Sequence, residues 1–251
     1  MITTSFEIRE ITTKDEYARL NDVLWTANFH PYLPVFTACH SVTGHTPEDR
    51  SKDRALDTDI QWAAHVKNPA SHLIYALDKA TGRVAGGCEW WIFHENPFPN
   101  GPHSIPCTWY PEGSERAELA SQFLSQAFFP RQCWLQRSHA GVNRMGVHPD
   151  YRRCGVGRLL MQWGHERIDE WGYESFIEAS PMARWLYEAC GYRRVMGLHI
   201  DLEKKDPGDE WERLTYECRP PGVLLLWRPP MGVWDEKVPT GPWAVTEETW
   251  K

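Results

Sequence analysis

The sequence predicts an α/β fold in which helices flank one mixed sheet. Segments rich in alternating apolar, β-branched and aromatic residues come between segments whose apolar residues recur at helical spacing. The elements follow the order β-α-α-β-β-β-α-β-α-β-β, which is typical of a sheet with both parallel and antiparallel neighbours. With 251 residues, of which 41% are hydrophobic, the chain is long enough for a single domain spanning 1–251.

Each expected element has a local signal. The strands are predicted from alternation and β-branched residues at 6–11, 73–78, 84–93, 140–147, 173–179, 194–202 and 223–227. The helices are predicted from apolar spacing, from Thr13, Asp15 and Thr46 as N-terminal caps, and from glycines at the far ends, over 15–25, 46–67, 155–171 and 181–190.

Four further regions complete the expected organisation. Residues 28–46, rich in Pro and His, and the charged residues 204–210 are expected to be loops. Residues 95–138, which include helical spacing over 111–129, are interpreted as an insertion that forms a lid or substrate wall. Residues from about 235 onward are expected to form an exposed tail.

Composition excludes several classes of protein. The formal net charge of -7 argues against nucleic-acid binding, which usually needs a basic face. No apolar run approaches the roughly 18 residues of a membrane span, and the N-terminus lacks the pattern of a signal peptide. The seven cysteines are an odd number without a CxxC pair, so we expect free thiols and a cytoplasmic or nucleocytoplasmic protein. The oligomeric state is left open.

A glycine-containing turn joins the predicted strand ending at Val147 to the predicted helix at 155–171. Such a turn directs backbone N–H groups and the positive end of the helix dipole toward one spot, which favours an anion. Gly155 and Gly157 would let a phosphate approach the backbone, and Arg152, Arg153 and Arg158 add positive charge. The alternative is a glycine-rich turn without a ligand.

Other motifs for common chemistries are missing from the sequence. No Gly-Lys-Ser/Thr follows the turn, and Leu160 stands where a dinucleotide loop has its third glycine. No HExxH or other paired metal-ligand spacing occurs, and no G-x-S-x-G elbow. We therefore expect no metal. His30 and His40, in the loop 28–46, are interpreted as surface or pocket residues.

Residues 147–160 resemble motif A of the N-acetyltransferase superfamily usually abbreviated GNAT. The family pattern is Gln or Arg, two residues, Gly, one residue, then Gly or Ala, and Arg152, Gly155 and Gly157 fill its three fixed positions. The segment 180–192 resembles a second family motif, in which Tyr187 and the Gly191-Tyr192 pair match. It departs from that motif at Ser180, where the family often has Asn. The resemblance covers about 142–192.

The resemblance implies a GNAT-like fold in which two parallel strands splay apart and form a cleft for acetyl-CoA. The co-substrate would lie against the end of the strand, the turn and the second motif, at Met145, Gly146, Val147, Arg152, Arg153, Cys154, Gly155, Val156, Gly157, Arg158, Ser180 and Tyr187. The amine would attack the thioester directly, with a base to deprotonate the ammonium and an acid to protonate the leaving thiolate.

The resemblance implies Tyr187 as the acid, with a packing tyrosine as the alternative. The base is open among Glu89, His139 and Glu178, and a water chain without a dedicated base is a further alternative. Glu178 is equally interpreted as an ion-pair partner and His139 as a surface residue. Gly141 stands where some relatives have a glutamate.

Three functions are therefore considered. The first is N-acetyl transfer from acetyl-CoA to a primary amine of a small molecule, with an apolar or aromatic part suggested by the aromatic residues in and near 95–138. The second is a CoA-binding sensor or scaffold with little catalysis. The third is acetylation of a lysine or N-terminus in a peptide or protein. Neither the amine nor the acyl chain length follows from the sequence.

Overall fold

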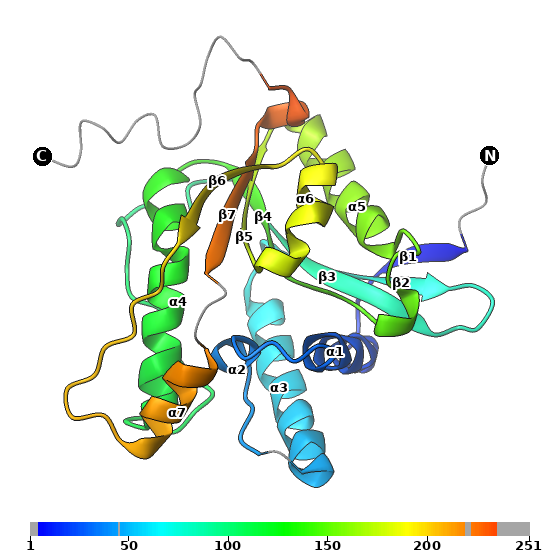
Figure 1. The fold of residues 1–251 in the computed structure, drawn as a ribbon. Helices are drawn as coiled ribbons and strands as arrows, with labels where there is room; N and C mark the ends of the chain where they lie inside the picture. The colour runs from blue at the N-terminus through cyan, green and yellow to red at the C-terminus, as the bar shows by residue number, and fades with distance from the viewer. Residues whose placement is uncertain (1–4, 45, 219–221, 235–251) are drawn as a thin grey trace, which may run out of the picture. The chain divides into compact units, whose positions relative to one another are not determined.

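The computed structural model describes residues 5–44, 46–218 and 222–234. Over these residues it contains a mixed sheet of seven strands in the order β1-β2-β3-β4-β5-β7-β6 (Figure 1). The strands are β1 (Phe6–Glu10), β2 (Ser71–Asp78), β3 (Val84–Phe93), β4 (His139–Val147), β5 (Glu174–Ala179), β6 (Arg193–Leu198) and β7 (Val223–Arg228). The α-helices are α1 (Lys14–Phe29), α2 (Phe36–Cys39), α3 (Pro47–Lys67), α4 (Glu115–Trp134), α5 (Val156–Glu170), α6 (Arg184–Ala189) and α7 (Asp209–Glu217). The mixed α/β fold expected from the sequence is confirmed.

The chain divides into two compact units, which are described separately. Unit 1 comprises residues 1–91, 108–114 and 142–164, and unit 2 comprises 92–107, 115–141 and 165–251. Strands β3 and β4 and helix α5 each contribute residues to both units. The single domain over 1–251 stays a prediction.

Unit 1 is built on the antiparallel strands β1, β2 and β3, with Ile8 opposite Ala76 and Tyr75 opposite Gly87. Helices α1 and α3 pack against each other, and Figure 1 shows both on one side of β2 and β3. Both helices begin with a capping box, in which a threonine and a carboxylate three residues later satisfy backbone N–H groups. The core contains Tyr17, Leu20, Leu24, Leu73 and Tyr75.

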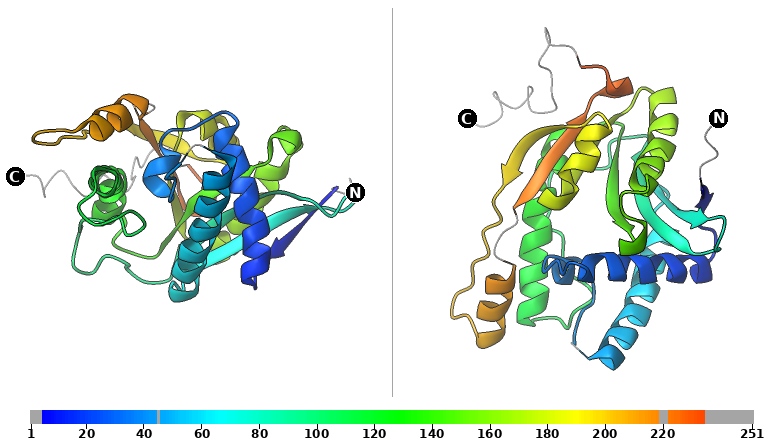
Figure 2. Two further views of the ribbon diagram at one scale, coloured as in Figure 1. Left: turned by 90° about the horizontal axis from the view of Figure 1, so that it is seen from below. Right: turned by 45° about the vertical axis from the view of Figure 1, so that its right-hand side comes forward.

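Unit 2 is built on β5, β7 and β6, which pair antiparallel, with Phe176 opposite Trp227. Strand β5 also pairs parallel with the first three residues of β4, His139 to Gly141. Helices α4 and α7 lie side by side in both views of Figure 2. Helix α4 continues through Pro130 to Trp134, five residues beyond the predicted helical end at 129.

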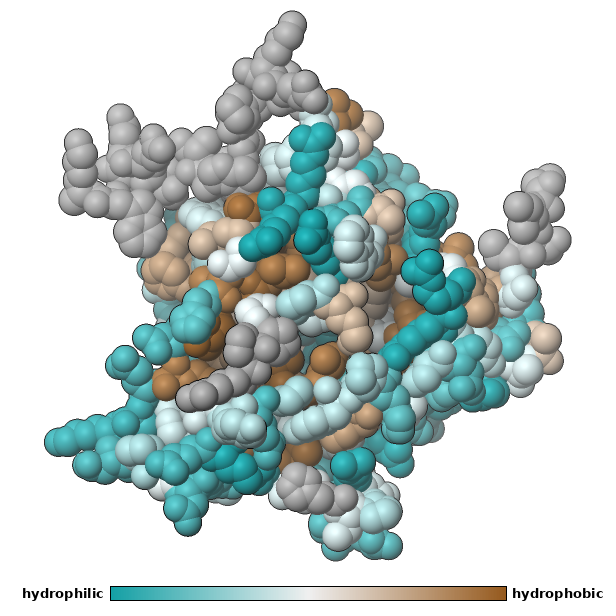
Figure 3. Space-filling model, viewed as in Figure 1, coloured by the Kyte–Doolittle hydropathy of each residue, from teal (hydrophilic) through white to brown (hydrophobic). Residues whose placement is uncertain are grey.

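Helix α7 is the main difference from the predicted elements, since the sequence led us to expect a charged loop at 204–210 and no helix after it. A tertiary contact accounts for the helix: the carboxylate of Glu115 accepts hydrogen bonds from the backbone N–H of Gly208 (2.8 Å) and of Trp211 (2.8 Å). A side chain 93 residues away thus caps the helix. Figure 3 shows this corner of unit 2 as hydrophilic, which fits the charged composition of the segment.

Two smaller differences concern the remaining segments. The predicted loop 28–46 contains the short helix α2. The predicted helix over 181–190 is observed as a 3-10 turn, Pro181–Ala183, followed by α6. The predicted tail from about 235 lies outside the described residues. In the part of the chain that the structure describes, no helix is long and apolar enough to cross a membrane.

Candidate functional site

The glycine-containing turn lies in unit 1, between the end of β4 and the start of α5. After a short 3-10 helix, Pro149–Tyr151, the turn places Arg153 (φ 65°) and Gly155 (φ 88°) in the left-handed region. This conformation is unusual for an arginine and free of steric cost only for the glycine. The first N–H groups of α5, from Val156 onward, have no acceptor within the helix. The turn therefore has the backbone form of an anion-binding nest.

Side chains around the turn fix its position on unit 1. The guanidinium of Arg152 donates to the carbonyl oxygen of Ala27 in α1 (2.9 Å) and to that of Val147 (3.4 Å). Its role in the structure is thus to hold the turn against α1 and β4. Arg153, Cys154, Gly155 and Arg158 are exposed, so these four residues are accessible to a ligand.

The end of β4 approaches helix α1 closely. A Cβ atom on Gly146 would lie 2.9 Å from a methyl carbon of Leu24 and 3.2 Å from the Cβ of Ala27. A Cβ atom here would crowd the side chains of Leu24 and Ala27, and glycine has none. The sequence-predicted residues Met145, Gly146 and Val147 therefore belong to a strand end that is tightly docked on α1.

Glu89 lies on β3 in unit 1 and is buried, with 2% of its surface exposed. Its carboxylate accepts hydrogen bonds from Ser71 (2.5 Å), Trp91 (3.0 Å), Asn143 (2.8 Å) and Arg144 (2.6 Å). Burial acts to raise the pKa of Glu89, but Arg144 and these hydrogen bonds outweigh it and hold the pKa below its ordinary value. Glu89 is thus an ionised group with four donors, and Arg144 also donates to the hydroxyl of Tyr17 (3.1 Å).

A second buried carboxylate of unit 1, Asp57 on α3, was not identified from the sequence. Its oxygens lie 3.0 and 3.1 Å from Nδ1 of His40. It also accepts hydrogen bonds from Trp25 (2.9 Å), Asn21 (3.1 Å) and Gln61 (3.3 Å). No local motif links the pair, because 17 residues separate them; the only signal was the interpretation of His40 as a surface or pocket residue.

Glu178 lies on β5 in unit 2 and pairs with Arg131 of α4. The side chains are 6% and 1% exposed, respectively. Burial raises the pKa of Glu178 above its ordinary value, although Arg131 opposes the shift. One terminal nitrogen of Arg131, Nη1, is buried without a partner in the described residues. Glu178 is thus an ion-pair partner, as one of its two interpretations from the sequence expected.

His139, at the start of β4 in unit 2, is fully buried between Phe93 and Phe98. Its Nδ1 lies 2.7 Å from the carbonyl oxygen of Arg137, and its Nε2 is buried without a partner in the described residues. Burial lowers the pKa of His139 to about 3. The interpretation of His139 as a surface residue was wrong, because the insertion supplies Phe98, which covers the ring.

The second motif lies in unit 2. Ser180 precedes the 3-10 turn Pro181–Ala183, and its side chain does not cap that turn. Tyr187 is 5% exposed on α6, and its ring lies edge-on to Tyr192 at 6.0 Å between centroids. Gly191 (φ 91°) ends the helix in the left-handed conformation that the motif's glycine predicts. Glu89 and the residues from Met145 to Arg158 thus lie in unit 1, whereas His139, Glu178, Ser180 and Tyr187 lie in unit 2.

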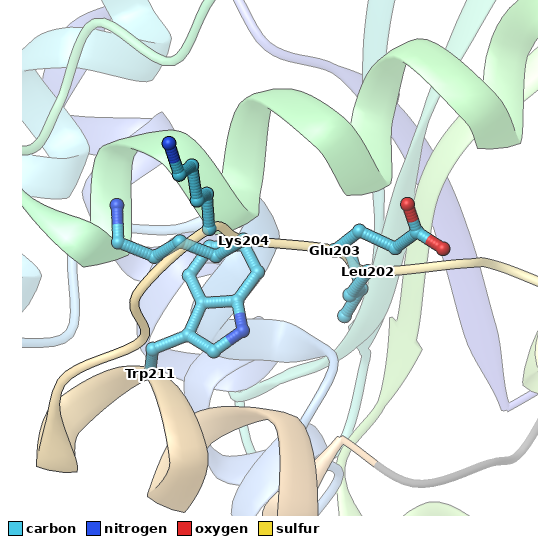
Figure 4. A pocket seen from close by; sticks show the side chains of 5 residues that line it. Leu202, Glu203, Lys204 and Trp211 are labelled. Atoms are coloured by element: carbon cyan, nitrogen blue, oxygen red, sulfur yellow. The ribbon is translucent and has the colours of Figure 1, made fainter.

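A shallow pocket in unit 2 contains none of these residues. It has a volume of about 640 Å³ and is lined by Leu202, Glu203, Lys204, Lys205 and Trp211 (Figure 4). Its Lys204 forms an ion pair with Glu118 and lies 5.5 Å from the ring centroid of Trp211. Among the described residues, no cluster of His, Cys, Asp and Glu side chains has the arrangement of a metal site.

Comparison with protein families gives a match over one part of the chain. Residues 124–194 match the model of an acetyltransferase (GNAT) domain. The matched segment includes the turn and the second motif. No curated protein sequence is significantly similar to the chain.

Solved structures with the same fold cover nearly the whole chain. A polyamine N-acetyltransferase of Drosophila melanogaster, which catalyses the formation of N-acetylagmatine, has a TM-score of 0.57 at 16% identity, covering 89% of this chain and 99% of its own. An agmatine N-acetyltransferase has a TM-score of 0.56 at 15% identity, covering 89% and 98%. A histone acetyltransferase HPA2 and related acetyltransferase from Corynebacterium glutamicum has a TM-score of 0.52 at 17% identity, covering 92% and 98%. At these identities the similarity establishes the fold.

Proposed function

We propose that this chain, whose residues 124–194 match a GNAT acetyltransferase domain, transfers an acetyl group from acetyl-CoA to the primary amine of a small molecule. The observation that carries the proposal is the turn at 152–157, with two residues in the left-handed conformation at the start of α5. A diphosphate would accept hydrogen bonds from the N–H groups of this nest, and Arg153 and Arg158 are exposed beside it.

The amine class is proposed on two grounds. Two of the proteins whose structures have this fold are a polyamine and an agmatine N-acetyltransferase, and both substrates are small cationic amines. The chain itself carries a net charge of -7, which attracts cations at long range. Aromatic residues support an apolar part of the substrate less strongly, because Trp90 is fully buried and donates to the carbonyl oxygen of Leu160.

The proposed chemistry needs the amine in its neutral form. Its nitrogen attacks the thioester carbon, the carbon–sulfur bond breaks, and the CoA thiolate takes up a proton. We assign that proton to the phenol of Tyr187, as the second motif implies. The proposed carboxylate bases have other partners: Glu89 is held by four donors and Glu178 by Arg131. Glu89 would therefore act by fixing Arg144 and β4.

The test combines acetyl-CoA binding with turnover. Wild-type protein should bind acetyl-CoA in calorimetry and release CoA thiol with at least one member of a panel of polyamines, agmatine, arylalkylamines and lysine peptides. Gly157→Glu should abolish binding, because it places a negative charge in the first turn of α5. Gln162→Glu adds the same charge farther along α5 and is the matched control. Equal affinity of Gly157→Glu and wild type would disprove the phosphate site.

Tyr187→Phe tests the acid separately. It keeps the ring that packs on Tyr192 and removes the hydroxyl. We expect kcat to fall by about 10²-fold, the lower end for general acid catalysis, with acetyl-CoA affinity nearly unchanged. A kcat within about threefold of wild type, with chemistry rate-limiting, would leave Tyr187 a packing residue.

A further inference from the structure

We propose that His40 is the general base that takes the proton from the acceptor ammonium, and that Asp57 is its positioning residue. The inference rests on the proposed acetyl transfer and deepens it, since it supplies the group that activates the amine. Both residues lie in unit 1, His40 just after α2 and Asp57 in α3. Neither belongs to the two sequence motifs.

Asp57 is a buried carboxylate, and no lysine or arginine among the described residues lies within hydrogen-bond distance of it. Its side chain is 1% exposed, and all its hydrogen-bond partners are neutral groups except the ring of His40. Burial acts to raise the pKa of Asp57, but His40 and the hydrogen bonds from His40 and Trp25 hold it well below the ordinary value. Asp57 is therefore a fixed negative charge directed at one imidazole.

The contact with Asp57 determines which nitrogen of His40 can act. An ionised carboxylate only accepts hydrogen bonds, so Nδ1 of His40 carries a proton and Nε2 of the neutral ring has a free lone pair. Nε2 has no hydrogen-bond partner among the described residues, and it is not one of the polar atoms that are sealed from solvent. A carboxylate behind Nδ1 also stabilises the imidazolium that forms when Nε2 takes a proton.

The ring is held rigidly in this orientation. It stacks on Phe36 with 4.0 Å between ring centroids, and the segment around it is fixed from both sides. The hydroxyl of Tyr110 donates to the carbonyl oxygen of His40 (2.9 Å), and Asp53 accepts hydrogen bonds from the backbone and hydroxyl of Thr43. Such support is what a base needs in order to meet a bound substrate at hydrogen-bond distance.

Helix α1 connects the pair to the anion-binding turn within unit 1. Ala27 of α1 accepts the hydrogen bond from Arg152 of the turn, and Trp25, two residues earlier, donates to Asp57. Two residues of helix span about 3 Å along its axis. Asp57 also interacts electrostatically with Arg144 of β4, the strand whose end precedes the turn. Asp57 thus contacts the same helix, α1, as Arg152 of the proposed cofactor site, and it interacts with the strand that leads to that site.

The proton balance is complete with these groups. The substrate ammonium gives one proton to Nε2 of His40, which becomes imidazolium paired with Asp57. The neutral amine then forms the carbon–nitrogen bond and loses its second nitrogen proton to water. The carbon–sulfur bond breaks, the thiolate takes a proton from the phenol of Tyr187, and water returns a proton to Tyr187. The imidazolium returns its proton to water, so each turnover yields the amide, CoA thiol and one released proton.

The experiment measures acetyl transfer by the full-length chain with the best amine of the panel, alongside calorimetric affinity for acetyl-CoA. His40→Gln should lower kcat/KM by about 10²–10⁴-fold and leave acetyl-CoA affinity within about threefold. His30→Gln, in the same segment, is the control and should match wild type. Added imidazole should raise the rate of acetyl transfer by His40→Ala at least tenfold over its rate without imidazole. A residue with only a packing role would not give this result.

Asp57→Asn tests the positioning role. It should lower kcat/KM, and combining it with His40→Gln should cost little beyond the larger single effect, because the two residues act as one unit. If Asp57→Asn does not fold, the imidazole rescue of His40→Ala still tests whether His40 is the base. Activity of His40→Gln within threefold of wild type, or no rescue of an inactive His40→Ala, would overturn the inference. If wild type itself transfers no acetyl group, the proposed function fails instead.

Discussion

Two buried glutamate–arginine pairs, one in each unit, differ in how fully their polar atoms are satisfied. In unit 1, Glu89 accepts four hydrogen bonds and its partner Arg144 has a further acceptor in Tyr17. In unit 2, Glu178 has Arg131 as its partner, and Nη1 of Arg131 is buried without one in the described residues. The pKa of Glu89 is lowered and that of Glu178 is raised.

The comparison shows that an arginine alone does not determine the charge state of a buried carboxylate. Burial is the largest influence on both glutamates and acts against ionisation in both. The donors from Ser71, Trp91 and Asn143 reverse its effect at Glu89. In the described part of the chain, Arg131 is the side-chain donor to Glu178, and no comparable set of neutral donors joins it. We infer that the unit 1 pair is the stronger structural element.

The largest expected effect comes from Glu89→Gln, which leaves the Arg144 charge buried without its carboxylate. We expect a loss of about 3–5 kcal/mol in the free energy of unfolding at pH 7, measured by urea titration. Glu178→Gln is the matched variant and should cost less than half as much, because ionisation of Glu178 is already disfavoured in the fold. Equal losses, or a larger loss at Glu178, would contradict the comparison.

The two pairs should also respond to pH in opposite directions. The folded-state pKa of Glu89 lies below the ordinary value of 4.5, so its contribution is complete above pH 4.5 and is lost as the pH falls through the folded pKa. The folded-state pKa of Glu178 lies above 4.5, so its contribution is complete below pH 4.5 and is lost as the pH rises through the folded pKa. Urea titrations of both variants and wild type between pH 4 and 8 measure this.

For these titrations, the stability deficit of Glu178→Gln relative to wild type should shrink as the pH rises, and that of Glu89→Gln should stay constant above pH 4.5. A deficit of Glu178→Gln that grows with rising pH would show that its carboxylate is stabilised as the anion. The difference between the two sites would then disappear.

The smallest effect is expected at His139, whose pKa is lowered to about 3 by burial. The unfolded chain takes up a proton below the ordinary value of 6.5, but the folded chain does not until about pH 3, so His139 reduces stability as the pH falls through this window. His139→Phe should change stability by less than about 1 kcal/mol at pH 7. Relative to wild type, it should gain about 1.4 kcal/mol per pH unit below 6.5.

Chemical unfolding at pH 7 and pH 5.5 measures this gain. His94→Phe, at an exposed histidine of the same unit, is the matched control for the loss of an imidazole. A pH dependence of His139→Phe identical to that of wild type would show that His139 takes up protons normally in the fold.

Local sequence signals were sufficient for elements that are stabilised by their own residues. Thr13 with Glu16, and Thr46 with Asp49, form capping boxes within three residues, so the starts of α1 and α3 were predictable. The turn at 152–157 was predictable because its glycines and arginines are contiguous. Helix α7 was not, since its cap comes from Glu115 of α4, and neither was the cover that Phe98 provides for His139.

The sequence by itself determined the α/β class, the glycine-containing turn at 152–157 and the resemblance to an acetyltransferase family, because each is encoded by residues close together in the chain. Only the tertiary structure decided in which direction the pKa of each titratable group is shifted and which polar atoms lack a hydrogen-bond partner in the described residues. Glu89, Glu178 and His139 were equivalent candidates in the sequence, and the pairing of His40 with Asp57 was not visible in it. Burial and hydrogen-bond partners set a pKa, and both come from residues that are distant along the chain.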